Sequence, residues 1–118
     1  MNLTTEHANG IAVVRVGESR LMYPLLSEFS SAVTQLIAAG ERRVIVNLAS
    51  VGYVDSATIG CIMDIYRLAK DQGGGLHILA PQARVETMLS MAGVHKIVPI
   101  FREEEEAIRA FAPSTGKQ

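Results

Sequence analysis

The stretch from Val44 to Gln72 constrains the fold most, because two hydrophobic periodicities meet inside it. Val44 to Leu48 is a nearly unbroken apolar run, which is typical of a strand covered on both faces. From Ile59 onward the apolar residues recur at spacings of three and four, which predicts a helix. These residues are Ile59, Ile62, Met63, Tyr66 and Ala69. A buried strand followed by a helix is the repeating unit of a parallel α/β sheet.

Asp55 and Ser56 lie where the first pattern gives way to the second. This places a carboxylate and a hydroxyl beyond the carboxyl end of a buried strand, the edge at which open α/β sheets usually build their sites. The structural alternative is helix capping, since Asp and Ser oxygens accept hydrogen bonds from free N–H groups of the first turn. The helix that follows is apolar over most of its surface, which indicates either a surface covered by a partner or a thickly covered core.

These residues resemble the signature of STAS domains, and most of all that of the bacterial anti-sigma factor antagonists. In that family a strand ends in Asp-Ser-Ser-Gly-Leu-Gly, and a partner kinase phosphorylates the first Ser, which is Ser56 here. The resemblance continues through Gly73–Leu79 and Val85–Val94. Ala57 and Thr58 replace the usual Ser-Gly. Met22 stands where the family often carries an acidic residue after its second strand.

The resemblance implies a protein-binding module switched by phosphorylation. With Ser56 unphosphorylated, the domain would bind a serine-kinase anti-sigma factor and so release a sigma factor for transcription. The kinase, which holds ATP, would phosphorylate Ser56 and end the binding, and a serine phosphatase would reverse this. The residues expected at the partner surface are Asp55, Ser56, Ala57, Thr58, Ile59 and Met91. No catalytic residue is expected in the chain itself, because the phosphoryl chemistry belongs to the kinase.

Two of the expected contacts have structural alternatives. Thr58 is either a secondary phosphoacceptor or a capping hydroxyl. Met91 is either core filler or an adaptable partner contact, whereas Met88 is expected to be filler.

A different class of function also fits the helix that follows Ser56: a non-switching STAS subunit of a lipid-transport ABC complex or a signalling scaffold. Regulation of a membrane sulfate transporter by a fused domain is disfavoured, because no membrane segment accompanies the domain.

Composition restricts the remaining choices. The chain has 118 residues, enough for one domain and one core, and its net charge of −1 lacks the basic footprint of a nucleic-acid-binding protein. Cys61 is the only cysteine, so no intrachain disulfide can form. The first residues have neither the basic region nor the apolar run of a signal peptide. No run approaches the roughly 20 apolar residues that span a bilayer. We therefore expect a cytoplasmic monomer or weak homodimer.

Catalytic, metal and cofactor sites are not expected. Ser56 lacks the Gly-x-Ser-x-Gly turn of serine hydrolases, although a Ser–His–Asp triad can assemble from any spacing. The three histidines show no ligand spacing with Cys61 or with one another. Gly73 to Gly75 ends a helix rather than opening one, so it is not a phosphate-binding loop.

The order of elements completes the predicted fold. Asn9-Gly10 predicts a hairpin between Leu3–His7 and Ile11–Val16. Further along, the pattern predicts helices from Pro24 to Gly40, from Pro81 to Gly93 and from Glu103 to Phe111, and strands at Leu76–Leu79 and Ile97–Phe101. The prediction is one α/β, STAS-like compact domain over residues 1–112. It has a mixed, mostly parallel sheet of four to five strands with an N-terminal hairpin, and about four helices. Residues 113–118 are expected to form a flexible C-terminal tail.

Overall fold

A computed structural model describes residues 2–111 of the chain. Its main sheet has five strands in the order β1-β2-β4-β6-β7. Their bounds are Leu3–Ala8, Ile11–Val16, Arg43–Asn47, Gly75–Leu79 and Ile100–Phe101. The helices are α1 (Leu25–Ala38), α2 (Ser56–Asp71), α3 (Ala83–Met91) and α4 (Glu104–Arg109). A second, two-stranded sheet pairs β3 (Arg20–Leu21) with β5 (Tyr53–Val54).

The strand directions follow from the connections between strands. β1 and β2 are antiparallel and are joined by a two-residue turn at Asn9 (φ 55°) and Gly10 (φ 77°), as Asn-Gly predicts. β2, β4, β6 and β7 are parallel, because a helix crosses over between each consecutive pair. β4 lies at the centre, between β2 and β6. The predicted mixed sheet with an N-terminal hairpin and four helices is confirmed.

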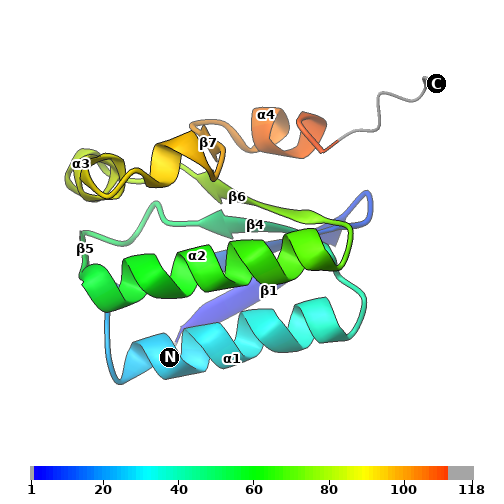
Figure 1. Cartoon of the computed structure of the whole chain (residues 1–118), viewed down its shortest axis with the longest axis horizontal. Helices are drawn as coiled ribbons and strands as arrows, with labels where there is room; N and C mark the ends of the chain where they lie inside the picture. The colour runs from blue at the N-terminus through cyan, green and yellow to red at the C-terminus, as the bar shows by residue number, and fades with distance from the viewer. Residues whose placement is uncertain (1, 112–118) are drawn as a thin grey trace.

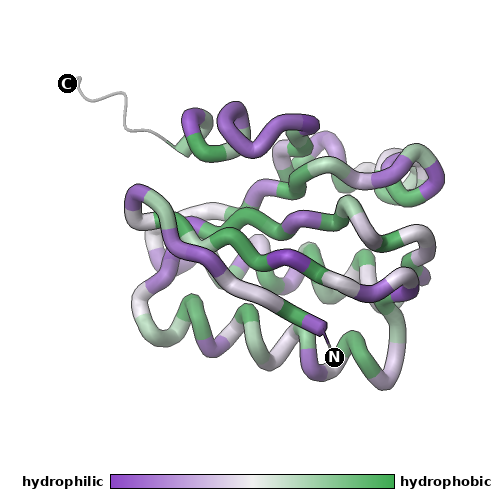
Figure 2. Tube along the Cα trace, turned by 180° about the vertical axis from the view of Figure 1, so that it is seen from behind, coloured by the Kyte–Doolittle hydropathy of each residue, from purple (hydrophilic) through white to green (hydrophobic). Residues whose placement is uncertain are grey.

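The two faces of the main sheet are covered unequally. Alternate side chains of a strand point to opposite faces: Val44 and Val46 of β4 join the larger apolar cluster, whereas Ile45 joins the smaller one. Helices α1 and α2 run side by side over the larger cluster, and α4 lies on the other face (Figure 1). Figure 2 shows mainly hydrophobic inner strands and a more polar edge strand β1.

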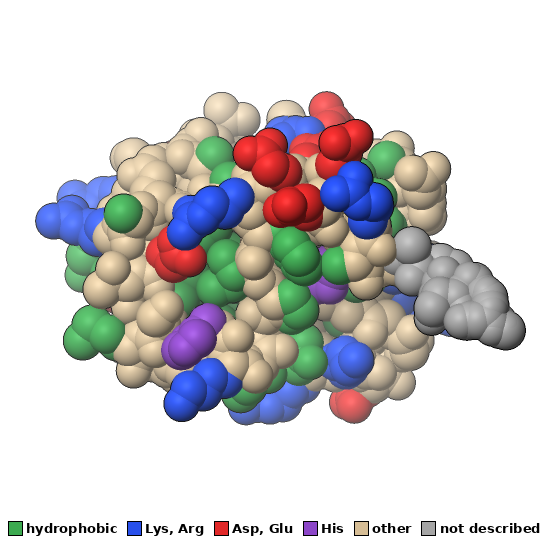
Figure 3. Space-filling model, turned by 90° about the horizontal axis from the view of Figure 1, so that it is seen from above, with side chains coloured by type: hydrophobic (Ala, Val, Ile, Leu, Met, Phe, Trp, Pro, Cys, Tyr) green, Lys and Arg blue, Asp and Glu red, His purple; other side chains and the backbone are tan. Residues whose placement is uncertain are grey.

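A charged network joins α4 to the hairpin. Arg15 of β2 lies within 2.8 Å of Oε1 of Glu6 in β1 and within 2.8 Å of Oε1 of Glu104 in α4. The hydrogen bonds that Arg15 donates to Glu6, and then the one to Glu104, raise the pKa of Arg15 above its ordinary value. Acidic side chains of the α4 segment gather on the surface above the sheet (Figure 3).

The last predicted strand is shorter than expected. Val94–Lys96 forms a 3₁₀ turn, and only Ile100–Phe101 pairs with β6. Proline has no N–H to donate to a ladder, so Pro99 delays the strand. Its carbonyl still accepts a hydrogen bond from the N–H of Ile78 at 2.9 Å. The prediction of a strand from Ile97 is therefore wrong, and Ile97 is 48% exposed.

Two expectations concern the ends of the chain and the membrane. The tail predicted for residues 113–118 lies outside the described residues. Across residues 2–111, none of the helices combines the length and the apolar character needed to cross a bilayer.

Candidate functional site

Ser56 is the first residue of α2, and its side chain is exposed. Asp55 is the N-cap, with extended backbone angles (φ −122°, ψ −175°). β5 leads directly into this cap, so a short strand separates Ser56 from the central strand β4. The first turn of α2, with Ser56, lies at the end of the molecule toward which β4 and β6 point (Figure 1), which is the edge that the sequence predicts.

Asp55 and Thr58 close a capping box at the start of α2. The N–H of Thr58 donates to Oδ1 of Asp55 at 3.0 Å, and the N–H of Asp55 donates to Oγ1 of Thr58 at 3.4 Å. Each side chain thus satisfies a backbone donor that the helix leaves free. The Asp55 carboxylate is half-buried, and capping accounts for its position.

Thr58 is not available to a partner or to a kinase. Its exposed fraction is 0%, and its hydroxyl hydrogen-bonds to the carbonyl oxygen of Leu21 in β3. The prediction of Thr58 as a partner contact or secondary phosphoacceptor is therefore wrong. Of the two alternatives, the structure assigns it to capping. The hydroxyl also ties the first turn of α2 to the small β3–β5 sheet.

The other predicted contacts divide into exposed and packed residues. Ala57 is exposed beside Ser56 on the first turn of α2. Ile59 is half-buried and packs against the larger cluster, so only part of its side chain can reach a partner. Met91 is 84% exposed at the end of α3, a helix that packs against β5. Met88 packs against the larger cluster, as expected for filler.

Sequence reasoning missed the surface around Tyr23. This residue is 64% exposed and forms a wall of two neighbouring hollows, of about 310 and 350 Å³. The second hollow also contains Met22, half-buried after β3. Beside it, the guanidinium of Arg20 lies 5.5 Å from the centre of the Tyr53 ring. An aromatic residue directly before Pro24 was the available signal, but its exposure depends on how β3 and α1 pack.

Cys61 is half-buried on α2. Burial raises the pKa of its thiol, the nearby Asp64 raises it further, and a hydrogen bond with Ser30 lowers it. The side chain packs against the larger apolar cluster, which is consistent with a structural role for Cys61. Within residues 2–111 no three His, Cys, Asp or Glu side chains are grouped as metal ligands.

The fold and the serine at the start of α2 define a class of protein. A family model described as "STAS domain" matches residues 2–107, and the chain belongs to this family. The anti-sigma F factor antagonist of Paenibacillus polymyxa is 26% identical over 114 residues, which cover 92% of each chain. Anti-sigma factor antagonists are regulatory proteins and not enzymes, in agreement with the prediction from the sequence.

Solved structures show the same fold. An anti-sigma factor antagonist from Mycobacterium paratuberculosis has a TM-score of 0.83 at 18% identity, covering 93% of this chain and 92% of its own. The Bacillus cell fate determinant SpoIIAA is known in two forms. Its unphosphorylated form has a TM-score of 0.79 at 20% identity, covering 92% of this chain and 95% of its own. Its phosphorylated form has a TM-score of 0.73 at 18% identity, covering 94% and 100%.

Proposed function

We propose that the protein is an anti-sigma factor antagonist switched by phosphorylation of Ser56. In the unphosphorylated state it binds a serine-kinase anti-sigma factor, and this binding frees a sigma factor for transcription. The anti-sigma factor holds ATP and transfers its γ-phosphoryl group to the Ser56 hydroxyl, after which the complex dissociates. A serine phosphatase removes the group. We place this cycle in the cytoplasm, with the antagonist acting as a monomer or weak homodimer.

The observation that carries the proposal is the exposure of Ser56 at the first position of α2. The hydroxyl of Thr58 is buried, so on this turn Ser56 is the residue whose hydroxyl a kinase can reach. Asp55 and Thr58 cap the helix, so the fold does not need the Ser56 hydroxyl. The relatives named as anti-sigma factor antagonists, and SpoIIAA in both phosphorylation states, support the assignment.

The free domain tolerates a phosphoryl group at this position. The first N–H groups of a helix have no partner within it, and Thr58 N–H is the one that Asp55 satisfies. The N–H groups of Ser56 and Ala57 and the positive end of the helix dipole therefore favour an anion. Phosphorylation adds about −1.5 to −2 charges at neutral pH. The fold is retained in both states.

The same group weakens a complex in which Ser56 is covered. A buried charge without a matched partner costs about 2–5 kcal/mol, and the Asp55 carboxylate next to it adds repulsion. This corresponds to roughly 30- to several-thousand-fold in affinity. A switch of this size needs no conformational change in the antagonist.

The test uses the serine-kinase anti-sigma factors of the protein's own genome. Each is incubated with the domain and ATP, and intact mass is measured. One phosphoryl addition to the wild type, lost in Ser56→Ala and kept in Ser50→Ala, supports the proposal. Ser50 is a matched control because it is exposed in the loop before β5. Binding to the same kinase with ADP is expected for the wild type and is lost in Ser56→Glu.

Two outcomes contradict the switch. The first is phosphorylation that persists in Ser56→Ala. The second is stable co-purification with a transport ATPase or permease that Ser56→Glu does not disturb, which would establish the non-switching subunit instead.

A further inference from the structure

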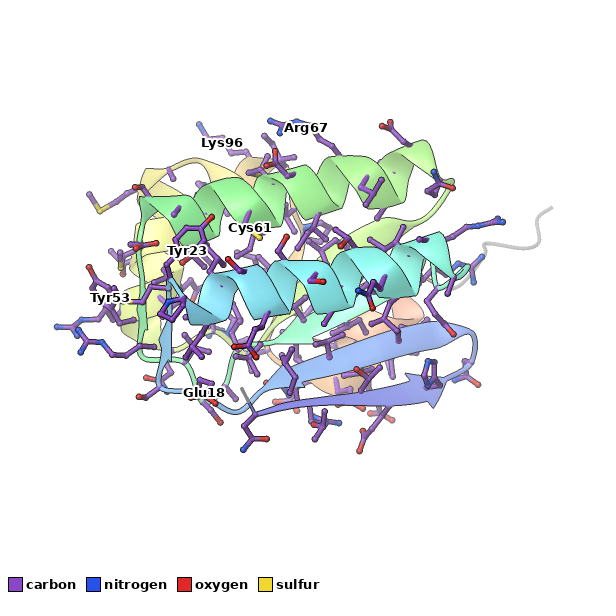
Figure 4. The ribbon with its side chains drawn as sticks, turned by 90° about the horizontal axis from the view of Figure 1, so that it is seen from below. Glu18, Tyr23, Tyr53, Cys61, Arg67 and Lys96 are labelled. Carbon is purple, nitrogen blue, oxygen red and sulfur yellow. The ribbon has the colours of Figure 1, made fainter. Side chains whose placement is uncertain are left out.

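A hollow of about 310 Å³ opens between α1 and α2 beside Ser56. On one side it is lined by Tyr23, Leu26 and Ser30. On the other side α2 contributes Ala57, Gly60, Cys61 and Asp64. Figure 4 shows Tyr23 and Cys61 in the space between the first halves of the two helices. Residues four apart are neighbours on a helix surface, so Ser56, Gly60 and Asp64 follow one line along α2.

Gly60 is the residue in this line that the fold itself does not explain. It is the fifth residue of α2, an interior position where glycine is less favourable than alanine because it loses more backbone freedom on folding. A Cβ at Gly60 would meet no heavy atom within 4 Å. Gly74 is different, since a Cβ there would lie 1.9 Å from the carbonyl oxygen of Arg42. The missing side chain at Gly60 therefore leaves space that this chain does not fill.

We propose that the hollow receives a large apolar side chain of the serine-kinase anti-sigma factor, and that Gly60 keeps the helix surface bare for it. This inference rests on the proposed function. A kinase that takes Ser56 into its active site must also cover the next turn of the same helix face, because an interface extends over about 800 Å² on each partner. Ala57, the residue after Ser56, lines the hollow, so a partner that covers Ser56 also reaches the hollow.

The lining defines the chemistry of the occupant. Ala57 and the Tyr23 ring give the exposed apolar surface of the hollow, and Leu26, 1% exposed, lies beneath it; this surface suits an aliphatic or aromatic anchor of the kind that dominates protein interfaces. Asp64 is the charged residue of the lining, and its side chain is 80% exposed. Its contact with Arg67, at 3.1 Å, is an exposed pair that a partner can replace at little cost. We therefore expect a lysine or arginine of the partner to meet Asp64 beside the anchor.

The first test fills the hollow. Gly60→Leu places a side chain where open space exists, so the variant is expected to fold with a Tm no lower than that of the wild type. Its Kd for the ADP-bound kinase that phosphorylates Ser56 is expected to rise roughly ten- to hundredfold, because an overfilled contact must repack. Ala38→Leu adds the same bulk at an exposed position near the end of α1 and is expected to leave the Kd unchanged.

Kinetics separate a docking role from a general defect. In Gly60→Leu the KM for phosphorylation of Ser56 is expected to rise while kcat changes little, since the hollow binds the kinase and touches no reacting atom. Asp64→Lys is expected to slow association and to reverse its dependence on salt. Asp71→Lys changes the net charge equally at the exposed far end of α2 and is expected to leave association unchanged.

The results distinguish this inference from the proposed function. If the wild type is phosphorylated at Ser56, and a folded Gly60→Leu binds the kinase as tightly as Ala38→Leu does, the hollow is not a docking site and the switch remains. If Asp64→Lys and Asp71→Lys change the association rate equally, the proposed contact between Asp64 and a basic residue of the kinase is wrong. If no kinase modifies Ser56, the proposed function fails, and this inference fails with it.

Discussion

Asp55 and Thr58 form two reciprocal hydrogen bonds at the start of α2, in which the backbone N–H of each residue donates to a side-chain oxygen of the other, at 3.0 and 3.4 Å. The Thr58 hydroxyl also bonds the carbonyl oxygen of Leu21, a residue 37 positions earlier in the chain. The first turn of α2 is thus fixed both within the helix and from β3. Ser56 is exposed on a turn whose geometry depends on its neighbours and not on its own side chain.

Thr58→Val is expected to destabilise the domain by about 1–3 kcal/mol, because it leaves the buried Leu21 carbonyl oxygen and the Asp55 N–H without their partner. Chemical denaturation measures this loss. Thr58→Ser keeps the hydroxyl and should recover most of the stability. An unchanged free energy of unfolding in Thr58→Val would contradict the structural role assigned to the hydroxyl.

Ser56→Glu is expected to leave the stability unchanged or to raise it by about 0.3–1 kcal/mol, because an exposed carboxylate at a helix N-terminus interacts favourably with the dipole. Thermal unfolding at low salt checks this, and the gain should shrink as salt is added. A clear loss of stability would mean that the free domain does not tolerate an anion here, against the proposed switch.

Gly74→Ala is expected to destabilise the domain by about 1–3 kcal/mol, because the new Cβ would lie 1.9 Å from the Arg42 carbonyl oxygen and the backbone must shift. Gly60→Ala is expected to stabilise it by up to about 1 kcal/mol, through helix propensity alone. Parallel urea titrations of the two variants give both values. A stabilised Gly74→Ala together with a destabilised Gly60→Ala would contradict the space that the structure gives around these two glycines.

His77 makes the stability dependent on pH. Its ring is buried and stacks on Phe111 at 3.6 Å between ring centres, and Nδ1–H donates to the carbonyl oxygen of Ala107 at 2.9 Å. Burial lowers the pKa of His77 below its ordinary 6.5, although the Ala107 hydrogen bond opposes the shift. The unfolded chain therefore binds more protons than the folded one just below pH 6.5. The contribution of His77 to the free energy of unfolding is therefore complete above pH 6.5. It is lost as the pH falls from 6.5 through the lower pKa of the folded state.

His77→Phe is expected to flatten this pH dependence, since phenylalanine can stack on Phe111 but does not titrate. The free energy of unfolding, measured from pH 8 to pH 5 for both proteins, reports the difference in slope. Equal slopes would show that another group causes the loss of stability in acid.

The sequence predicts the elements whose signals are local and long. Asn9-Gly10 determines its own hairpin, and the apolar spacing in α2 extends over four turns. The short strands β3 and β5 were not predicted, because two residues show no periodicity and the partners are far apart in the sequence. Ile97 misled the strand prediction because a β-branched apolar residue favours strands even where Pro99 removes a ladder donor.

The candidate site could be located from the sequence but not resolved into roles. The change of period at Asp55 and Ser56 identified the start of a helix, and the structure has Ser56 exposed there. The burial of Thr58 could not be predicted, because it depends on the Leu21 carbonyl of another strand. The hollow at Gly60 was equally hidden, since it forms only when α1 packs beside α2.

The two faces of the main sheet are covered unequally, which implies that the helix on the thinner side unfolds locally before the rest of the domain. α4 has six residues, too few to remain helical by itself, and it is held by Ala107 in the smaller cluster and by the Glu104–Arg15 pair. Its amide protons should exchange with deuterium sooner than those of β4 and of the middle of α2, which open only when the whole domain unfolds. Local unfolding of α4 would thus leave the opposite helical layer, with α2 and its exposed Ser56, folded.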